Sequence, residues 1–237
     1  MVFLTLLIAC LIERFWQTIA GVRHWGWLNH YNDWVATVTA KTPFNKQFAN
    51  YFIVVVSLLC LVLIIQGLLL PLTYYTWYYI FNFLVLLYCF GPENFYKPFA
   101  TDTAELSSID IYDEAVKANR MVFGVFFWFA ILGAFGAVLY RVTERMSKNE
   151  FVQSVLDVLD WIPVRLLAVT FGLVSYFITV FPICLKYLCC SPKDNQQLLT
   201  ECTKASLAED QNTVHFLALV DRSLIVWLVV LALIVLL

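Results

Sequence analysis

Long apolar runs alternate with shorter polar stretches along this chain. The longest run, from Gln47 to Pro92, contains no charged residue. Because one helical membrane crossing takes about 20 mostly apolar residues, this run is long enough for two. Gln66-Gly67 and Pro71 are expected to break the run near its middle, and proline cannot take part in regular helical hydrogen bonding. The run therefore predicts a helical hairpin over residues 50–69 and 72–90.

Four further apolar runs lie at residues 1–12, 121–140, 166–185 and 223–237. The first is too short for a crossing unless Glu13 and Arg14 are drawn into the boundary of the bilayer. The last reaches the required length only if its helix extends back through the preceding VHFLALVDR. Together the runs predict an all-α, multi-span integral membrane protein with re-entrant or interfacial helices.

Polar residues gather in three stretches between these runs, at 13–50, 93–120 and 186–222. The first is rich in Trp, which favours the membrane–water interface, and so predicts a helix along the bilayer surface. The second is acidic, and we expect its second half to be a surface helix. Helical spacing predicts that its buried stripe consists of Ile109, Tyr112, Val116 and Met121. We expect the whole chain, 1–237, to form a single membrane domain.

The distribution of basic residues predicts the orientation of the hairpin. Its tip near Pro71 carries no Lys or Arg. The lysines that flank its outer ends are Lys41, Lys46 and Lys97. By the positive-inside rule, the tip faces the periplasm and the stretch 93–120 faces the cytoplasm. If the run 121–140 crosses the membrane, the basic residues that follow it lie on the periplasmic side, against this rule. The run therefore either crosses against the rule or enters the membrane and returns without crossing.

Composition supports a membrane protein and excludes one class of partner. Hydrophobic residues make up 62% of the chain and charged residues 14%, and the mean hydropathy is +0.78. A soluble domain typically has about 45–50% apolar and about 25% charged residues. The net charge of −2 provides no basic field for binding nucleic acid.

The seven cysteines do not indicate a disulfide framework, because their number is odd and most lie in or beside apolar runs. Cys184 with Cys189 and Cys190 is an alternative site for a soft metal, but packing as small apolar side chains is the simpler interpretation. His24 and His30 are not spaced like metal ligands. No metal, cofactor or catalytic residue is predicted.

Three charged residues lie just before an apolar run and need a physical explanation. Asp157 and Asp160 belong to a helix expected over 149–162, which Pro163 is expected to end. Arg165 then falls in the first turn of the next helix, where the macrodipole disfavours a cation. We therefore expect Arg165 to contact one of the aspartates. Three roles stay open for this group: a corner between two helices, a ligand site, or an arginine that extends to the lipid headgroups.

Two segments of the chain resemble the AmpE family. They are LDVLDWIPVRLLAVTFGLVSYF and, before it, ANRMVFGVFFWFAILGAFGAVLYRVTE. LIERFW, HWGWLNHYNDW and FGPENFYKPF extend the resemblance over most of the chain. Members of this family are bacterial inner-membrane proteins linked to β-lactamase induction and encoded beside a cytosolic anhydromuramyl-peptide amidase.

The resemblance implies a multi-pass protein of the inner (cytoplasmic) membrane with a regulatory or signalling role. The implied context is the antibiotic response and the recycling of peptidoglycan as muropeptides. The implied partners are the lipid bilayer and either that amidase or a small cell-wall-derived ligand, and nucleic acid is not among them.

The same segments are distantly similar to the CbiB/CobD synthases of cobalamin biosynthesis, which are amide ligases. The positions that match are Asp157, Trp161, Pro163 and Arg165 in one block, and Gly133, Gly136, Ala137, Tyr140 and Arg141 in the other. Of the synthases' acidic run before that second block, only Asn119 is retained. The loss of carboxylates able to bind a metal–nucleotide complex argues against ligase activity. An ATP-dependent ligase that uses ATP and Mg is therefore the alternative hypothesis.

From these matches we expect a non-catalytic ligand site in a polar pocket at the membrane boundary. Its candidate residues are Asn119, Arg120, Arg141, Arg145, Asp157, Asp160, Trp161 and Arg165, with Glu13 and Arg14 as secondary candidates. The sequence does not identify the ligand. Turnover of ATP by the purified protein that is lost in Asp157→Ala would favour the ligase instead.

Overall fold

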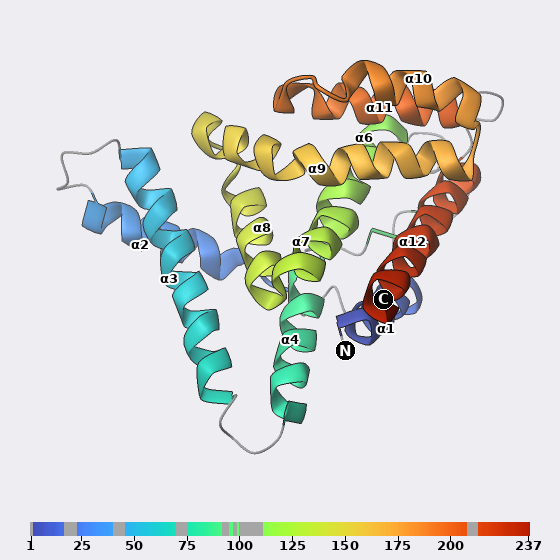
Figure 1. Cartoon of the computed structure of the whole chain (residues 1–237). Coiled ribbons are helices and arrows are strands. Elements are labelled where there is room, and N and C mark those ends of the chain that lie inside the picture. The colour runs from blue at the N-terminus through green and yellow to red at the C-terminus, as the bar shows by residue number, and fades with distance from the viewer. Residues whose placement is uncertain are drawn as a thin grey trace. The chain divides into compact units, whose positions relative to one another are not determined.

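The computed structural model describes residues 2–16, 23–39, 46–69, 75–91, 95–96, 99, 111–207 and 213–237. All regular elements among these residues are helices, and no strand occurs in these ranges (Figure 1). The predicted all-α class is confirmed.

The chain divides into two compact units. Unit 1 comprises residues 1–94 and 128–156, and unit 2 comprises residues 95–127 and 157–237. The chain passes between the units three times, once between residues 94 and 95 and twice inside helices, in α7 (Gly124–Leu132) and in α9 (Glu150–Val174). That the whole chain acts as a single membrane domain stays a prediction.

The predicted hairpin is present in unit 1. Its helices, α3 (Lys46–Leu69) and α4 (Tyr75–Cys89), contact each other and lie next to each other in Figure 1. Its tip, with Pro71, lies outside the described residues. Gln66 does not interrupt α3, and its Nε2 donates a hydrogen bond of 3.1 Å to Oδ1 of Asn82 on α4. Hydrogen bonds between polar side chains help to hold apolar helices together.

Two shorter helices pack on this hairpin. Helix α1 (Val2–Phe15) contacts α4, and helix α2 (Gly26–Thr39) contacts α3. Helix α1 takes in Glu13 and Arg14 but has 14 residues, which is shorter than one membrane crossing. Trp34 of α2 is exposed, as expected for a helix at a membrane surface.

The apolar run 121–140 is not one continuous helix. Helix α7 ends just before Gly133, and α8 (Ala134–Met146) begins just after it. Gly133 has a φ of 65° and a ψ of −148°, a conformation that residues with a Cβ rarely adopt. A Cβ at Gly136 would lie 2.1 Å from the carbonyl oxygen of Trp128. The two glycines thus allow a sharp turn, with the start of α8 close against the end of α7.

Three helical stretches among the described residues are long and apolar enough to cross a membrane. They are Gln47–Leu69, Ile111–Leu132 and Thr213–Leu236. The third is helix α12, which begins at Thr213, immediately before VHFLALVDR, so the predicted extension of the C-terminal run is confirmed. The second begins well before the predicted run at 121–140. These three stretches are those expected of a membrane protein.

In unit 2, helix α6 (Ile111–Ala118) continues through a π-helical turn, Asn119–Phe123, into α7. The predicted stripe is wrong: Tyr112, Val116 and Met121 are half-buried, and Ile109 lies outside the described residues. The buried residues of α6 are instead Glu114, Ala115 and Ala118. Helix α6 contacts both α11 (Asn195–Ser206) and α12, and the two alanines allow helices to approach closely.

Helix α9 continues through Pro163 and has 25 residues, so the predicted break at this proline is wrong. A proline inside a helix costs about 3 kcal/mol or more, because it removes one hydrogen bond and its ring crowds the preceding turn. The next turn, however, buries Val164, Leu167 and Ala168 almost completely. Packing of these apolar side chains offsets the local cost.

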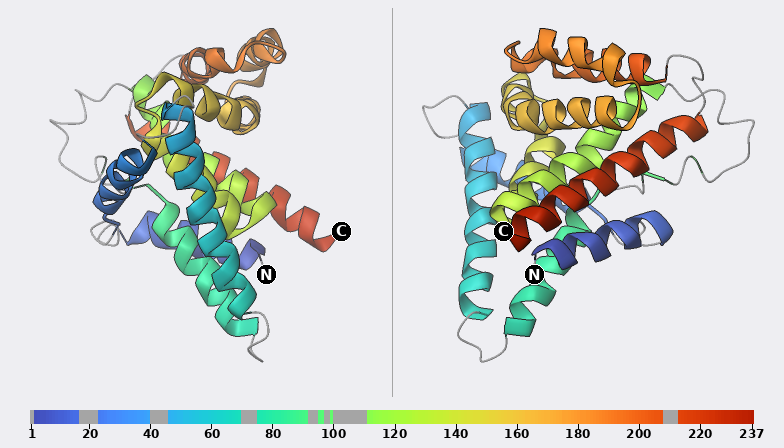
Figure 2. Two further views of the ribbon diagram at one scale, coloured as in Figure 1. Left: turned by 90° about the vertical axis from the view of Figure 1, so that its left-hand side faces the viewer. Right: turned by 45° about the vertical axis from the view of Figure 1, so that its right-hand side comes forward.

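The apolar run 166–185 is divided between two helices of unit 2. Helix α9 ends at Val174, and α10 (Phe177–Tyr187) begins after a bend at Ser175 and Tyr176. Helix α10 packs on α11, and Figure 2 shows these two helices side by side. The run therefore does not form one helix of crossing length.

Candidate functional site

Arg165 of α9 uses every donor of its guanidinium group within unit 2. Nε donates to the carbonyl of Leu188 at 3.1 Å. Nη1 donates to the carbonyl of Trp161 at 2.9 Å and to Oδ1 of Asn195 at 3.0 Å. Nη2 donates to the carbonyls of Tyr187 at 3.1 Å and Cys190 at 2.9 Å. A guanidinium has five N–H groups. No donor of Arg165 is therefore left for a further partner.

These contacts explain why a buried arginine is stable at this position. Three of the acceptors are carbonyls at or just after the C-terminal end of α10, where carbonyls lack helical partners and the macrodipole favours a cation. The guanidinium also lies 4.2 Å from the centre of the Trp161 ring, a cation–π contact. The predicted contact of Arg165 with Asp157 or Asp160 is therefore wrong, because its partners are carbonyl oxygens and not carboxylates.

Asp160 instead lies against the π-helical turn of unit 2. Its carboxylate is buried, with a 4% exposed residue surface. Oδ1 accepts a hydrogen bond of 2.8 Å from Nδ2 of Asn119, and Oδ2 lies 4.0 Å from Nε of Arg120. The turn thus presents two successive side chains to one buried carboxylate. Turns of this kind are frequent at functional sites.

Asn195, at the start of α11, links Arg165 to the backbone of α9 one turn before Asp160. Its Oδ1 accepts from Arg165, and its Nδ2 donates to the backbone carbonyl of Asp157 at 2.7 Å. We call this set of residues the polar junction; its members are Asn119, Arg120, Asp157, Asp160, Trp161, Arg165 and Asn195. Sequence analysis missed Asn195, since an asparagine in a polar stretch carries no distinguishing signal.

The candidates Arg141 and Arg145 belong to unit 1. Arg141 is fully buried, and its Nε donates to the carbonyl of Cys89 at 2.6 Å. Its Nη1 lies 3.1 Å from Oε2 of Glu144, and Nε of Arg145 lies 4.0 Å from the same oxygen. In unit 1 these two arginines therefore share one carboxylate.

The secondary candidate Glu13 forms a buried ion pair, also in unit 1. Its Oε2 lies 2.6 Å from Nη2 of Arg23, and both side chains are almost completely buried. Nη1 of Arg23 donates to the carbonyl of Gly91 at 3.1 Å. Arg14, by contrast, is exposed. Sequence analysis missed Arg23, although a cation within the aromatic segment VRHWGW was a usable signal.

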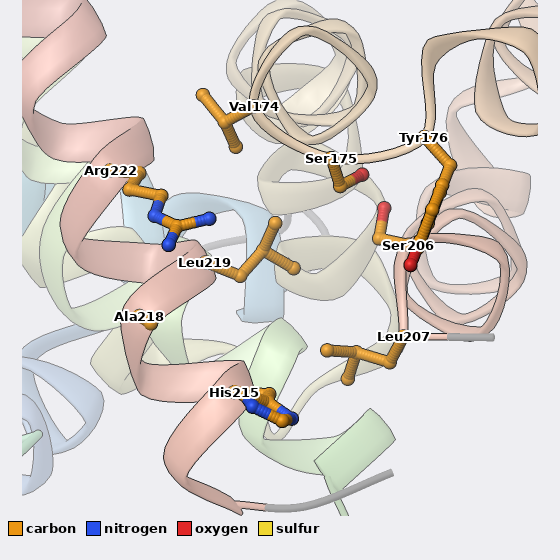
Figure 3. A pocket seen from close by; sticks show the side chains of 9 residues that line it. All are labelled: Val174, Ser175, Tyr176, Ser206, Leu207, His215, Ala218, Leu219 and Arg222. Carbon is orange, nitrogen blue, oxygen red and sulfur yellow. The ribbon is translucent and has the colours of Figure 1, made fainter. Parts of the chain in front are cut away.

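Unit 2 contains a cavity of about 420 Å³ that other residues line. They are Val174, Ser175, Tyr176, Ser206, Leu207, His215, Ala218, Leu219 and Arg222 (Figure 3). Sequence analysis treated VHFLALVDR only as an extension of an apolar run. Arg222 itself was a usable signal, because an ionisable residue in an apolar helix is a candidate for function.

A comparison with protein families matches residues 118–237, about half of the chain, to the family described as regulatory signalling modulator protein AmpE. The match includes the polar junction, Arg141, Arg145 and every residue that lines the cavity of unit 2. No curated protein and no solved structure matches the chain. The chain belongs to the AmpE family of regulatory signalling modulator proteins.

Proposed function

We propose that this protein is a multi-pass regulator in the bacterial inner membrane that acts in β-lactamase induction and in the recycling of cell-wall muropeptides. The observation that carries the proposal is the family match over residues 118–237. The three helical stretches of crossing length support a membrane location. A small cell-wall-derived ligand and a cytosolic anhydromuramyl-peptide amidase are the partners that we propose.

We further propose that the polar junction holds the helices of unit 2 together and that the ligand binds elsewhere in this unit. The support is the hydrogen bonding of Arg165, whose five donors all have protein acceptors. A ligand that binds Arg165 would have to displace these hydrogen bonds within the protein, each of which contributes about 1.5–3 kcal/mol when one partner is charged. The alternative of an ATP-dependent ligase has no support from the family match.

The test is β-lactamase activity in cells with and without the gene. In the strain without the gene, we expect a lower ratio of activity after a β-lactam inducer to activity before it. The gene carried on a plasmid should restore the ratio, with the protein detected in the inner-membrane fraction. The same ratio in both strains would contradict the proposed role. Hydrolysis of ATP by the purified protein in the presence of Mg²⁺ would point to the ligase instead.

A further inference from the structure

The cavity of unit 2 brings together three chain segments. The end of α9 and the bend after it contribute Ser175 and Tyr176, the end of α11 contributes Ser206, and one face of α12 contributes His215 and Arg222. Its volume of about 420 Å³ falls within the range of small-molecule sites, which is about 300–1,000 Å³. The lining includes one arginine and no Asp or Glu.

Arg222 supplies the positive charge of this cavity. Figure 3 shows its guanidinium extending from α12 toward the space between the helices. Among the described residues, Arg222 has no hydrogen-bond or ion-pair partner, and the neighbouring Asp221 accepts instead from the hydroxyl of Tyr96 at 3.0 Å. Arg222 is exposed, and an arginine that no protein carboxylate pairs with is suited to a ligand that brings the negative charge.

Ser206 supplies a second donor. The residue is 5% exposed, and its hydroxyl has no hydrogen-bond partner among the described residues. A buried hydroxyl without a partner costs about 1–3 kcal/mol, and most such groups in native proteins are paired. In Figure 3 this hydroxyl lies on the opposite side of the cavity from Arg222, next to Ser175. Ser175 already donates to the carbonyl of Phe171 at 2.6 Å, so it is available as an acceptor.

We propose that this cavity binds a ligand through a phosphate group. The guanidinium of Arg222 pairs with two phosphate oxygens in a planar fork, and the hydroxyl of Ser206 donates to a third oxygen on the opposite side. A phosphate offers enough acceptor oxygens for both walls at once, whereas a carboxylate has two. The cavity is larger than a bare phosphate, so the ligand is a phosphate ester.

Two sources can supply such a group. One is a soluble phosphate monoester, and the other is the headgroup of a phospholipid, since α12 is a stretch of crossing length. The site is a candidate for the ligand of the proposed function, and to that extent rests on it. Binding to the purified protein, however, is measured without any reference to β-lactamase.

The experiment is isothermal titration calorimetry on the purified full-length protein in detergent. The probes are sn-glycerol 3-phosphate, a short-chain phosphatidylglycerol and sodium acetate. The variants are Arg222→Ala and Ser206→Ala, with Lys193→Ala as a control for the loss of one exposed cation of unit 2 outside the cavity. Thermal unfolding of each variant without a probe accompanies the titrations.

We expect saturable binding of at least one phosphate probe. Arg222→Ala should weaken it by about tenfold or more, because a charge-assisted hydrogen bond is lost, and Lys193→Ala should bind like the wild type. Ser206→Ala should weaken binding yet leave the melting temperature equal or higher, since it removes a buried donor that has no partner. If Ser206 had only a structural role, its removal would not weaken binding while leaving the melting temperature equal or higher.

Glycerol 3-phosphate alone would identify a soluble ester as the source, and phosphatidylglycerol alone would identify a lipid headgroup. The site would be refuted if neither phosphate probe saturates, if both cavity variants bind like the wild type, or if acetate binds as tightly. If binding is confirmed but deletion of the gene leaves β-lactamase induction unchanged, the site stands and the proposed function fails.

Discussion

Arg165→Ala is expected to destabilise the protein by about 3 kcal/mol or more, because a hydrogen bond to a charged group contributes about 1.5–3 kcal/mol and several are lost together. The substitution takes away five hydrogen bonds at once, three of them to carbonyls at the end of α10. It also removes the cation–π contact with Trp161. Thermal unfolding of the purified protein in detergent measures the effect as a lower melting temperature.

Arg222→Ala is the matched control, because it removes an arginine of unit 2 that has no protein partner among the described residues. It should stay within about 0.5 kcal/mol of the wild type, as is usual for exposed positions. Arg165→Lys should recover part of the loss, since an ammonium has three donors where the guanidinium has five. Equal melting temperatures for Arg165→Ala and Arg222→Ala would show that the contacts of Arg165 do not stabilise the fold.

The second large effect is expected at the ion pair of Glu13 and Arg23. Arg23→Ala should destabilise the protein by about 3–5 kcal/mol, because it removes the arginine from a buried ion pair with Glu13. Glu13→Gln should have a smaller effect, since the amide oxygen still accepts a hydrogen bond from Arg23. Chemical unfolding of the single and double variants gives the coupling energy, which for residues in contact is about 0.5–3 kcal/mol.

The control for this pair is Arg14→Ala, which removes an exposed charge next to Glu13. It should change stability by no more than about 0.5 kcal/mol. Because the two members of the pair are 10 residues apart and in direct contact, their effects should not be additive. Strictly additive losses in the double variant would show that the two side chains contribute independently.

The elements that could be predicted from sequence are those specified by local composition. The hairpin of α3 and α4 follows from an uncharged run long enough for two helices. The C-terminal helix follows from the length that a crossing requires, which placed its start before Ser223. In both cases the pattern of apolar positions within one segment determines the element, so no knowledge of distant residues is needed.

The elements that could not be predicted depend on distant residues. Pro163 indicates a helix end by its own chemistry, but packing of the residues after it keeps α9 continuous. The acceptors of Arg165 at the end of α10 lie 22 to 25 positions further along the chain. Nothing in the sequence near Arg165 identifies them, and local sequence therefore favours the two nearby aspartates as partners.

The candidate functional residues likewise include some that could be predicted from sequence and some that could not. Asn119 and Asp160 are 41 positions apart but could be grouped because both fall in segments that resemble one family. Ser206 and Arg222 fall in a polar stretch and in an apolar helix, and no shared motif connects them. A buried hydroxyl without a partner is a property of the folded chain, and sequence alone does not reveal it.

The passage of the chain between the units inside α7 and α9 also affects the order in which the protein is made. During synthesis, unit 2 receives its first segment, 95–127, before unit 1 receives its last, 128–156. Neither unit is therefore completed before the other has begun, and no cut in a loop between the units separates them. A fragment that carries one whole unit must be joined from two pieces of chain, so this protein is best inserted, folded and studied as one polypeptide.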